Sequence, residues 1–150
     1  MAAVLTLAGI NDLKRVAPLV AVFHLEVSLT TSDPHRKAAT TKLLDGTPLG
    51  ALYLIGPRAA PVGHIAISHE FSIEFGGAYS LIDEFFIRPP ISSKGLGAES
   101  LLTVCKLLEA NGTRSVHLEV ANANETAHQL YSRCGFSLRT NYHLMNKELN

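Results

Sequence analysis

The sequence predicts an α/β fold in which helices flank a mixed, largely antiparallel central sheet. Short runs of apolar and β-branched residues alternate with segments that have helical spacing. Two such runs in the middle of the chain are joined by Gly76-Gly77, which permits a tight hairpin turn. With 150 residues the chain is long enough to bury a core, and we expect residues 1–150 to form a single domain.

The first third of the chain predicts one strand and two helices. Residues 3–8 form a short apolar run that is typical of a strand. Asn11-Asp12 offers a cap for the first helix, which carries apolar residues near helical spacing. Ser32-Asp33-Pro34 indicates the start of a second helix, and Asp45-Gly46 indicates its end.

The middle of the chain predicts antiparallel strands at residues 50–55, 62–73 and 78–87. A helix is expected from about Gly95 to Ala110, because apolar residues there recur at i, i+3, i+4 and i+7.

The C-terminal part predicts a strand at residues 115–120 and a short helix from Asn124 to Arg133. Residues 136–138 and 142–149 are expected to form a final hairpin. The predicted order is therefore β-α-α-β-β-β-α-β-α-β-β.

Composition narrows the functional classes. Apolar residues make up 47% and charged residues 17%, as in compact globular proteins. Thirteen basic and thirteen acidic residues give no electrostatic case for binding nucleic acid or an anionic membrane. No apolar run reaches the roughly 18 residues of a membrane helix. Because Met1 to Gly9 also lacks the basic leader of a signal peptide, we expect a cytoplasmic protein.

The loop after the third middle strand holds Lys94-Gly95-Leu96-Gly97 directly before a predicted helix. Free N–H groups and the positive end of the dipole at a helix start suit a phosphate anion. Glycines also let a ligand approach the main chain. The alternative is that Gly95 and Gly97 only shape a turn.

A second motif, N-x-x-A-x-x-L-Y-x-x-x-G-F, runs from Asn124 to Phe136. Seven residues are close to two helical turns, so Asn124 and Tyr131 share one face of the helix. The alternative for Tyr131 is a half-buried structural side chain.

Together these motifs resemble the GNAT family of N-acetyltransferases over roughly residues 50–149. The acyl-coenzyme A loop of that family has the pattern Arg/Gln-x-x-Gly-x-Gly/Ala, and here it is Ser92-Ser93-Lys94-Gly95-Leu96-Gly97. Both glycines match, whereas Ser92 replaces the arginine or glutamine. Residues 71–77, with Asp83-Glu84 beyond them, look like one bacterial subgroup of the family.

The resemblance implies a GNAT-like sheet and acetyl-coenzyme A (acetyl-CoA) as the donor. The loop before the long helix would hold the diphosphate, and the strand around Phe86 would pair with the pantetheine arm. One backbone N–H near Phe86 would face the thioester carbonyl. The residues implied in donor binding are Phe85, Phe86, Ile87, Ser92, Ser93, Lys94, Gly95, Leu96, Gly97, Ala98, Asn124 and Tyr131.

The resemblance also implies direct attack by a primary amine in a ternary complex. Glu84 is the candidate general base, and Asp83 is its rival because neighbouring strand residues point to opposite faces. A β-bulge would change which of the two faces the cleft. Tyr131 resembles the general acid that protonates the departing thiolate, a role that suits a phenol with a pKa near 10. Asn124 could cap its helix as well as bind the coenzyme.

We expect a small-molecule or peptide amine as the acceptor, and a homodimer is possible from the resemblance alone. None of the seven histidines forms a pair with metal-ligand spacing, so no metal is expected. A non-catalytic acyl-CoA-binding module is the main alternative, and Ser92 leaves it open. A nucleotide-binding domain ranks last, because neither a full P-loop nor G-x-G-x-x-G is present.

Overall fold

The computed structural model of the chain describes residues 3–89, 91–93 and 95–149. Its strands are β1 (Leu5–Leu7), β2 (Gly50–Ile55), β3 (Gly63–Ser72), β4 (Gly77–Ile87) and β5 (Val116–Leu118). Its helices are α1 (Leu13–Glu26), α2 (Asp33–Leu44), α3 (Leu96–Ala110) and α4 (Glu125–Arg133), with short 3-10 turns η1 (Ile10–Asp12) and η2 (Ile91–Ser93).

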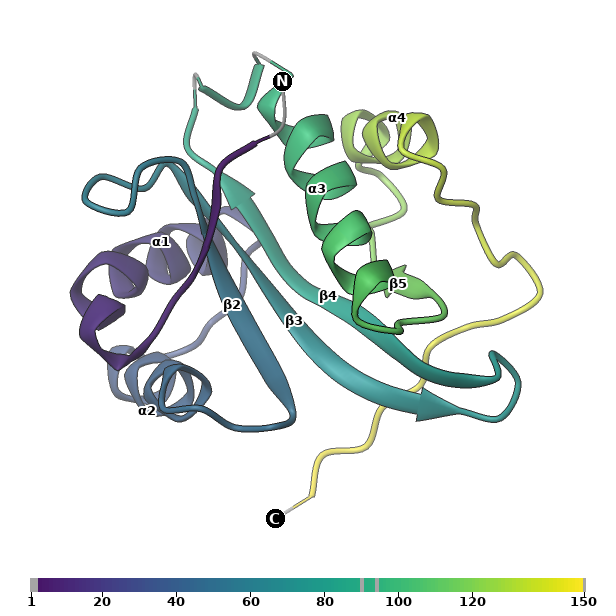
Figure 1. Cartoon of the computed structure of the whole chain (residues 1–150), viewed down its shortest axis with the longest axis horizontal. Coiled ribbons are helices and arrows are strands. Elements are labelled where there is room, and N and C mark those ends of the chain that lie inside the picture. The colour runs from purple at the N-terminus through teal and green to yellow at the C-terminus, as the bar shows by residue number, and fades with distance from the viewer. Residues whose placement is uncertain (1–2, 90, 94, 150) are drawn as a thin grey trace.

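The predicted fold class is confirmed. The described part of the chain forms a five-stranded sheet in the order β1-β2-β3-β4-β5. Neighbours from β1 to β4 are antiparallel, whereas β5 lies parallel to β4 because α3 carries the chain back across the sheet (Figure 1). The predicted hairpin is present: its turn covers residues 73–76 between β3 and β4, and Gly77 is the first residue of β4.

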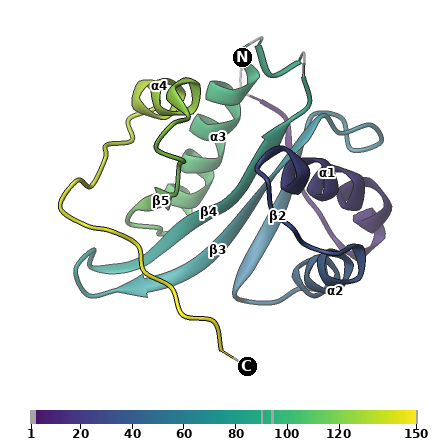
Figure 2. The ribbon, with the colours of Figure 1, turned by 180° about the vertical axis from the view of Figure 1, so that it is seen from behind.

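Helices cover both faces of this sheet. Figures 1 and 2 show α1 and α2 on one face and α3 with α4 on the other. The apolar core is divided accordingly into two clusters. The first is centred on Val16, Leu19, Leu52, Leu54 and Phe86. The second is centred on Ile55, Ile65, Ile67, Leu101 and Val104. No helix within the described ranges is long and apolar enough to cross a lipid bilayer.

Local signals explain most of the helix boundaries. The Ser32 hydroxyl accepts a hydrogen bond from His35 N at 3.2 Å, which caps α2. Asp12 is the N-cap of α1, but its side chain makes no cap bond. Its buried carboxylate instead accepts hydrogen bonds from Gly9 N at 2.9 Å and from Arg58 Nη2 at 2.7 Å. These bonds hold the pKa of Asp12 at about 2, and the hydrogen bond from Arg58 is the largest cause.

The predicted C-terminal hairpin is wrong. Residues 136–149 contain no strand, and the described segment leaves α4 and passes outside the sheet (Figure 2). The backbone hydrogen bond described within it, from Tyr142 N to Arg139 O at 3.2 Å, closes only a turn. Apolar alternation indicates strand propensity, but a strand also needs a neighbour with which to pair.

Candidate active site

The sheet opens between β4 and β5. In the described pairing, Ser80 to Ile82 of β4 lie opposite Val116 to Leu118 of β5. Beyond Ile82, β4 continues to Ile87 with β3 on one side and without β5 on the other. The side of β4 from Asp83 to Ile87 that faces away from β3 is therefore an open edge, with no strand beside it in the described part of the chain. An open edge of this kind can pair with an extended ligand.

Hydrogen-bond register indicates which amides face the open edge. Arg88 N donates to Val62 O at 2.8 Å, so the N–H of Arg88 points to β3. Alternate residues of an antiparallel strand direct their backbone groups to the same neighbour. The N–H of Phe86 therefore also points to β3, whereas those of Phe85 and Ile87 point to the open edge.

The N-terminus of α3 lies next to this edge. Gly95 is the N-cap of α3 in the left-handed conformation, with φ +78°. A Cβ added there would meet nothing within 4 Å. A Cβ on Gly97 would lie 3.4 Å from Leu130 Cδ2 of α4 and 3.8 Å from Phe85 Cζ, so α3, α4 and the end of β4 converge at Gly97.

The first turn of α3 can hold an anion. Among the described residues, the N–H groups of Leu96, Gly97 and Ala98 have no intrahelical acceptor, and the first such bond runs from Glu99 N to Gly95 O. Free N–H groups at a helix start are the donors that a diphosphate requires, and the space where a Cβ of Gly95 would lie is open. In the neighbouring turn η2, which includes Ser93, the Ser92 side chain is exposed. The predicted phosphate contact Lys94 lies outside the described residues.

A β-bulge determines where the two candidate bases point. Ala66 lies opposite Glu84, and the next residue, Ile67, lies opposite Ile82. Asp83 is therefore an extra residue in β4. Because opposed residues share a face, the bulge puts Glu84 on the same face as Ala66, the face that α1 covers. Without the bulge, Asp83 would occupy this position.

Two histidines bind the Glu84 carboxylate. His64, two residues before Ala66 in β3, donates from Nε2 to Glu84 Oε1 at 2.9 Å. His24 of α1 donates from Nε2 to Glu84 Oε2 at 2.5 Å. His24 Nδ1 lies 2.7 Å from the Thr31 hydroxyl oxygen, so both of its ring nitrogens are engaged. These contacts fix the orientation of the carboxylate.

The surroundings of His64 indicate which ring nitrogen carries the proton that faces Glu84. Its side chain is fully buried, and Nδ1 has no hydrogen-bond partner among the described residues. An N–H on Nδ1 would be buried without an acceptor, which is costly. The tautomer with its proton on Nε2 donates to Glu84 and leaves only a lone pair on Nδ1.

The environments of the two carboxylates move their pKa values apart. Burial raises the pKa of Glu84, but the hydrogen bonds from His64 and His24 outweigh burial, so the net pKa lies below the ordinary value. Asp83 is exposed, yet partial desolvation and the charges of Glu84 and Glu119 raise its pKa. Glu84 is therefore the more strongly stabilised carboxylate at neutral pH.

Tyr131 and Asn124 are both on the α4 side of the sheet. Tyr131 packs against the second core cluster, which also contacts Phe85, and its ring lies 6.0 Å from that of Phe136. Burial raises the pKa of Tyr131 above its usual value of 10, so the phenol carries its proton at neutral pH. Asn124 Oδ1 accepts a hydrogen bond from Ala127 N at 3.1 Å and caps α4.

The structure therefore brings some of the predicted residues together and separates others. Phe85, Gly97 and the α4 helix of Tyr131 meet beside the open edge of β4. Glu84 belongs to the opposite layer, under α1, so Glu84 and Tyr131 can approach one molecule only through the opening between β4 and β5. The roles of His24 and His64 could not be predicted from the sequence, since only the bulge aligns Glu84 with them.

The chain matches the model of the acetyltransferase (GNAT) family over residues 19–136. No curated protein matches the sequence. Several solved structures share the fold. An integron cassette protein from the mobile metagenome of Cole Harbour Salt Marsh is 30% identical, with a TM-score of 0.83 over 97% of this chain and 90% of that one.

Two further solved structures are more distant in sequence. A crystal structure of a putative acetyltransferase from Arthrobacter sp. FB24 is 22% identical, with a TM-score of 0.77 over 98% of this chain and 94% of that one. An aminoglycoside acetyltransferase from an uncultured soil metagenomic sample, in complex with sisomicin, is 11% identical. Its TM-score is 0.81, over 99% of this chain and 97% of that one.

Proposed function

This chain belongs to the GNAT family of acetyltransferases, and from that premise we propose that it transfers the acetyl group of acetyl-CoA to a primary amine in a ternary complex. The observation that carries the proposal is the open edge of β4, which starts beside the Glu84 carboxylate and leads to the N-terminus of α3. One extended ligand with an anionic end can contact both the open edge of β4 and the N-terminus of α3.

The donor would bind through backbone groups. Its diphosphate would accept hydrogen bonds from the N–H groups of Leu96, Gly97 and Ala98, where the helix dipole favours negative charge. Its pantetheine arm would pair with the open edge through Phe85 and Ile87. Because these contacts use the main chain, the replacement of the family arginine or glutamine by Ser92 weakens binding without abolishing it.

The thioester carbonyl would then lie near the N–H of Phe85, next to Glu84 in the chain. As the amine nitrogen attacks, the carbonyl oxygen gains negative charge, and this N–H stabilises it. The new C–N bond forms and the C–S bond breaks, so the acetyl group passes to the amine and coenzyme A leaves as a thiolate.

Proton transfers complete the reaction. A primary amine attacks only when neutral, so an ammonium acceptor must first lose a proton, and Glu84 is the base that would take it, directly or through a water. Each oxygen of Glu84 keeps a free lone pair after its histidine hydrogen bond, and the side chain is 14% exposed. Tyr131 would protonate the departing thiolate from the α4 side.

The acceptor side of the site favours a cationic amine. Asp83 interacts electrostatically with both Glu84 and Glu119, and the negative charge of these three carboxylates would attract an ammonium group. One protein of the same fold was solved with sisomicin, an aminoglycoside, so an aminoglycoside belongs in the panel of amines to be tested.

Two measurements test the proposal. Acetyl-CoA at a hundred times its dissociation constant should stabilise the protein by about 2.7 kcal/mol in a thermal-shift assay, whereas ATP and NAD should not. Release of free thiol with a panel of polyamines, amino acids, aminoglycosides and peptides should then identify an acceptor. Stabilisation without turnover by any amine would favour the acyl-CoA-binding module instead, and stabilisation by ATP would refute the proposal.

A further inference from the structure

The loop between α1 and α2, residues 27–32, holds one side of the Glu84 carboxylate through a chain of hydrogen bonds. Glu84 Oε2 accepts from His24 Nε2 at 2.5 Å, and His24 Nδ1 lies 2.7 Å from the Thr31 hydroxyl oxygen. Arg36 of α2 donates from Nη1 to the same hydroxyl oxygen at 3.2 Å and also to the Thr31 carbonyl. One continuous chain therefore runs from α2 through the loop and α1 to the candidate base on β4.

The donors and acceptors in this chain of hydrogen bonds agree with one direction. Because His24 Nε2 donates to the ionised Glu84 carboxylate, Nδ1 of the neutral ring carries a lone pair and accepts. The Thr31 hydroxyl has one proton to donate, and the bond from Arg36 occupies one of its two lone pairs. The hydroxyl proton is thus free to point to His24 Nδ1. Every group is satisfied when Thr31 donates to His24 and His24 donates to Glu84.

The backbone of the loop brings Thr31 back to His24. Ser28 has a φ of +61° and is the only residue other than glycine with a positive φ in the described part of the chain. This conformation is unfavourable for a residue with a Cβ, so the surrounding structure must enforce it. Leu29 N donates to His24 O at 2.8 Å, which ties the reversed chain to the last turn of α1. The reversal allows the contact between the side chains of His24 and Thr31, seven residues apart.

The two histidines that bind Glu84 are held in different ways. The His64 side chain is fully buried within the sheet, so packing restrains it on all sides. The His24 side chain is 12% exposed and lies in the last turn of α1, and helix ends open more readily than helix centres. The orientation of the His24 ring therefore depends on a polar contact, and Thr31 supplies that contact.

We propose that Thr31 is a positioning residue for the acetyl transfer: its hydroxyl fixes the His24 ring, and the ring directs the Glu84 carboxylate to the opening between β4 and β5. This inference rests on the proposed function, because it gives Thr31 a part in the reaction that Glu84 would serve as the base. The reaction needs a carboxylate oxygen aimed at the amine, and an error in that orientation lowers the rate without weakening the binding of the donor.

The titratable groups around Glu84 determine what the loss of the Thr31 hydroxyl would change. The groups that face the carboxylate are His64 of β3, His24 of α1 and the neighbouring Asp83 of β4. Burial raises the pKa of Glu84, but the hydrogen bonds from the two histidines outweigh burial and hold this pKa below the ordinary value of 4.5. Without the Thr31 hydroxyl, the bond from His24 would be made less often, so the pKa of Glu84 would rise.

The titration of Glu84 tests the proposal without any turnover. Carbon-13 NMR of the glutamate side-chain carboxyls, in the full-length protein alone, should place the Glu84 midpoint below 4.5. Thr31→Val keeps the shape of threonine but removes the hydroxyl, so the midpoint should rise. Thr31→Ser keeps the hydroxyl and should restore the midpoint of the unchanged protein. An equal midpoint in Thr31→Val and the unchanged protein would overturn the proposal.

Turnover separates this inference from the proposed function. Thr31→Val should lower kcat by about 3- to 10-fold, the effect of one neutral hydrogen bond on an equilibrium, and should leave the dissociation constant of acetyl-CoA unchanged. Thr31→Ser should retain the kcat of the unchanged protein. If the unchanged protein acetylates an amine and Thr31→Val does so equally fast, only the role of Thr31 is wrong. If the unchanged protein acetylates no amine, the proposed function is wrong, and this inference with it.

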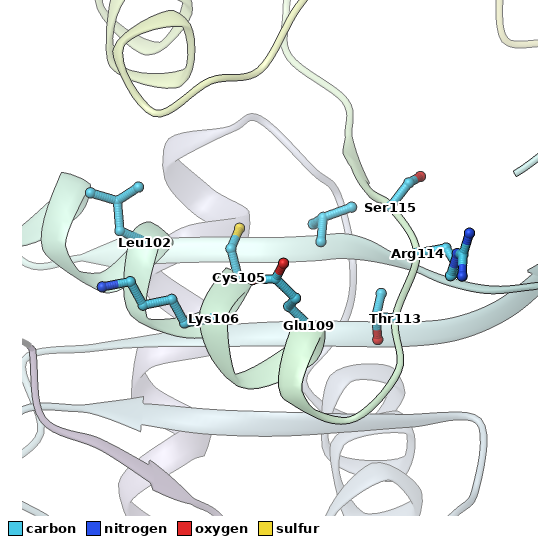
Figure 3. A pocket seen from close by; sticks show the side chains of 8 residues that line it. Leu102, Cys105, Lys106, Glu109, Thr113, Arg114 and Ser115 are labelled. Atoms are coloured by element: carbon cyan, nitrogen blue, oxygen red, sulfur yellow. The ribbon is translucent and has the colours of Figure 1, made fainter.

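Two further variants make the test specific to this chain of hydrogen bonds. Thr113→Val removes the hydroxyl of another half-buried threonine, beside a hollow of about 270 Å³ next to α3 on the other face of the sheet (Figure 3), and should change neither readout. His24→Ala should by itself raise the Glu84 midpoint and lower kcat. Thr31→Val added to His24→Ala should have no further effect, because Thr31 acts through His24. A further fall in kcat in the double variant, or an effect of Thr113→Val as large as that of Thr31→Val, would overturn the proposal.

Discussion

The Glu84→Gln substitution tests the proposed base and the network that holds it. Glutamine has the same shape as glutamate, but it presents one carbonyl oxygen and one NH₂ group. The carbonyl can still accept a hydrogen bond from one of the two histidines. The NH₂ group then faces Nε2 of the other histidine, and this is a contact between two donors unless that histidine changes its tautomer.

The loss of folding free energy expected for Glu84→Gln follows from this geometry. At His64 a change of tautomer would put an N–H on the buried and unpartnered Nδ1, whereas at His24 the Thr31 hydroxyl could accept from Nδ1. In either case the hydrogen bonds to a carboxylate become hydrogen bonds to a neutral amide, and this loss of charge assistance costs about 2 kcal/mol of folding free energy at pH 7. Because the folded-state pKa of Glu84 is lowered, its stabilising contribution is present above the ordinary value of 4.5 and is lost as the pH falls through the folded pKa.

Two assays check this prediction. Urea unfolding should show a stability difference between the two proteins at pH 7 that shrinks as the pH falls below 4.5. Thiol release with a good acceptor should fall by about 10²- to 10⁴-fold, the range for loss of a general base, while the thermal shift with acetyl-CoA is kept. Asp83→Asn, at the neighbouring and exposed carboxylate, is the matched control and should retain most of the turnover.

Either of two results would refute the reasoning. Unchanged turnover in Glu84→Gln together with a large loss in Asp83→Asn would make Asp83 the base. Equal unfolding free energies for Glu84→Gln and the unchanged protein at pH 7 would show that the histidines do not stabilise the carboxylate.

Three further predictions follow from the same structure. Tyr131→Phe keeps the packing but removes the acid, so kcat should fall by about 10²-fold, the low end of the range for a proton-transfer group, with acetyl-CoA binding unchanged. Full activity would show that the phenol only contributes packing. Gly95→Ala adds a Cβ to the open space where the diphosphate is expected, so calorimetry should show weaker binding of coenzyme A. Gly46→Ala is the control: this glycine also has a positive φ and nothing within 4 Å of an added Cβ, so the substitution should cause a similar backbone strain and leave binding intact. Asp12→Asn weakens the buried hydrogen bonds from Arg58 and should lower the free energy of unfolding in urea by about 2 kcal/mol at pH 7. This difference should fade as the pH drops from 4 toward the Asp12 pKa of about 2. A difference that persists at pH 2 would contradict the role given to the charge.

Elements with local signals could be predicted from the sequence. Gly76-Gly77 set the β3–β4 hairpin, Ser32 capped α2, and Gly95 preceded α3, because each signal acts within a few residues of the element that it defines. The strand expected at residues 115–120 was also found, but the structure limits it to Val116–Leu118.

The contacts that shape the candidate site could not be predicted in this way. His24 and Glu84 are 60 residues apart in the chain, and the Asp83 bulge decides which carboxylate reaches the histidines. A bulge changes the register without a clear mark in the sequence. The predicted C-terminal hairpin was wrong for a related reason. Alternation of apolar residues along 136–149 indicates a propensity to form a strand, but it does not identify the strand with which the segment would pair.

The most direct test of the central claim is a crystal structure of the protein with coenzyme A. The account predicts that the diphosphate contacts the amides at the start of α3, with the pantetheine arm hydrogen-bonded to Phe85 and Ile87 and the sulfur in the opening between Glu84 and Tyr131. A coenzyme bound away from the open edge of β4, or a sulfur that only one of these two side chains can approach, would contradict it.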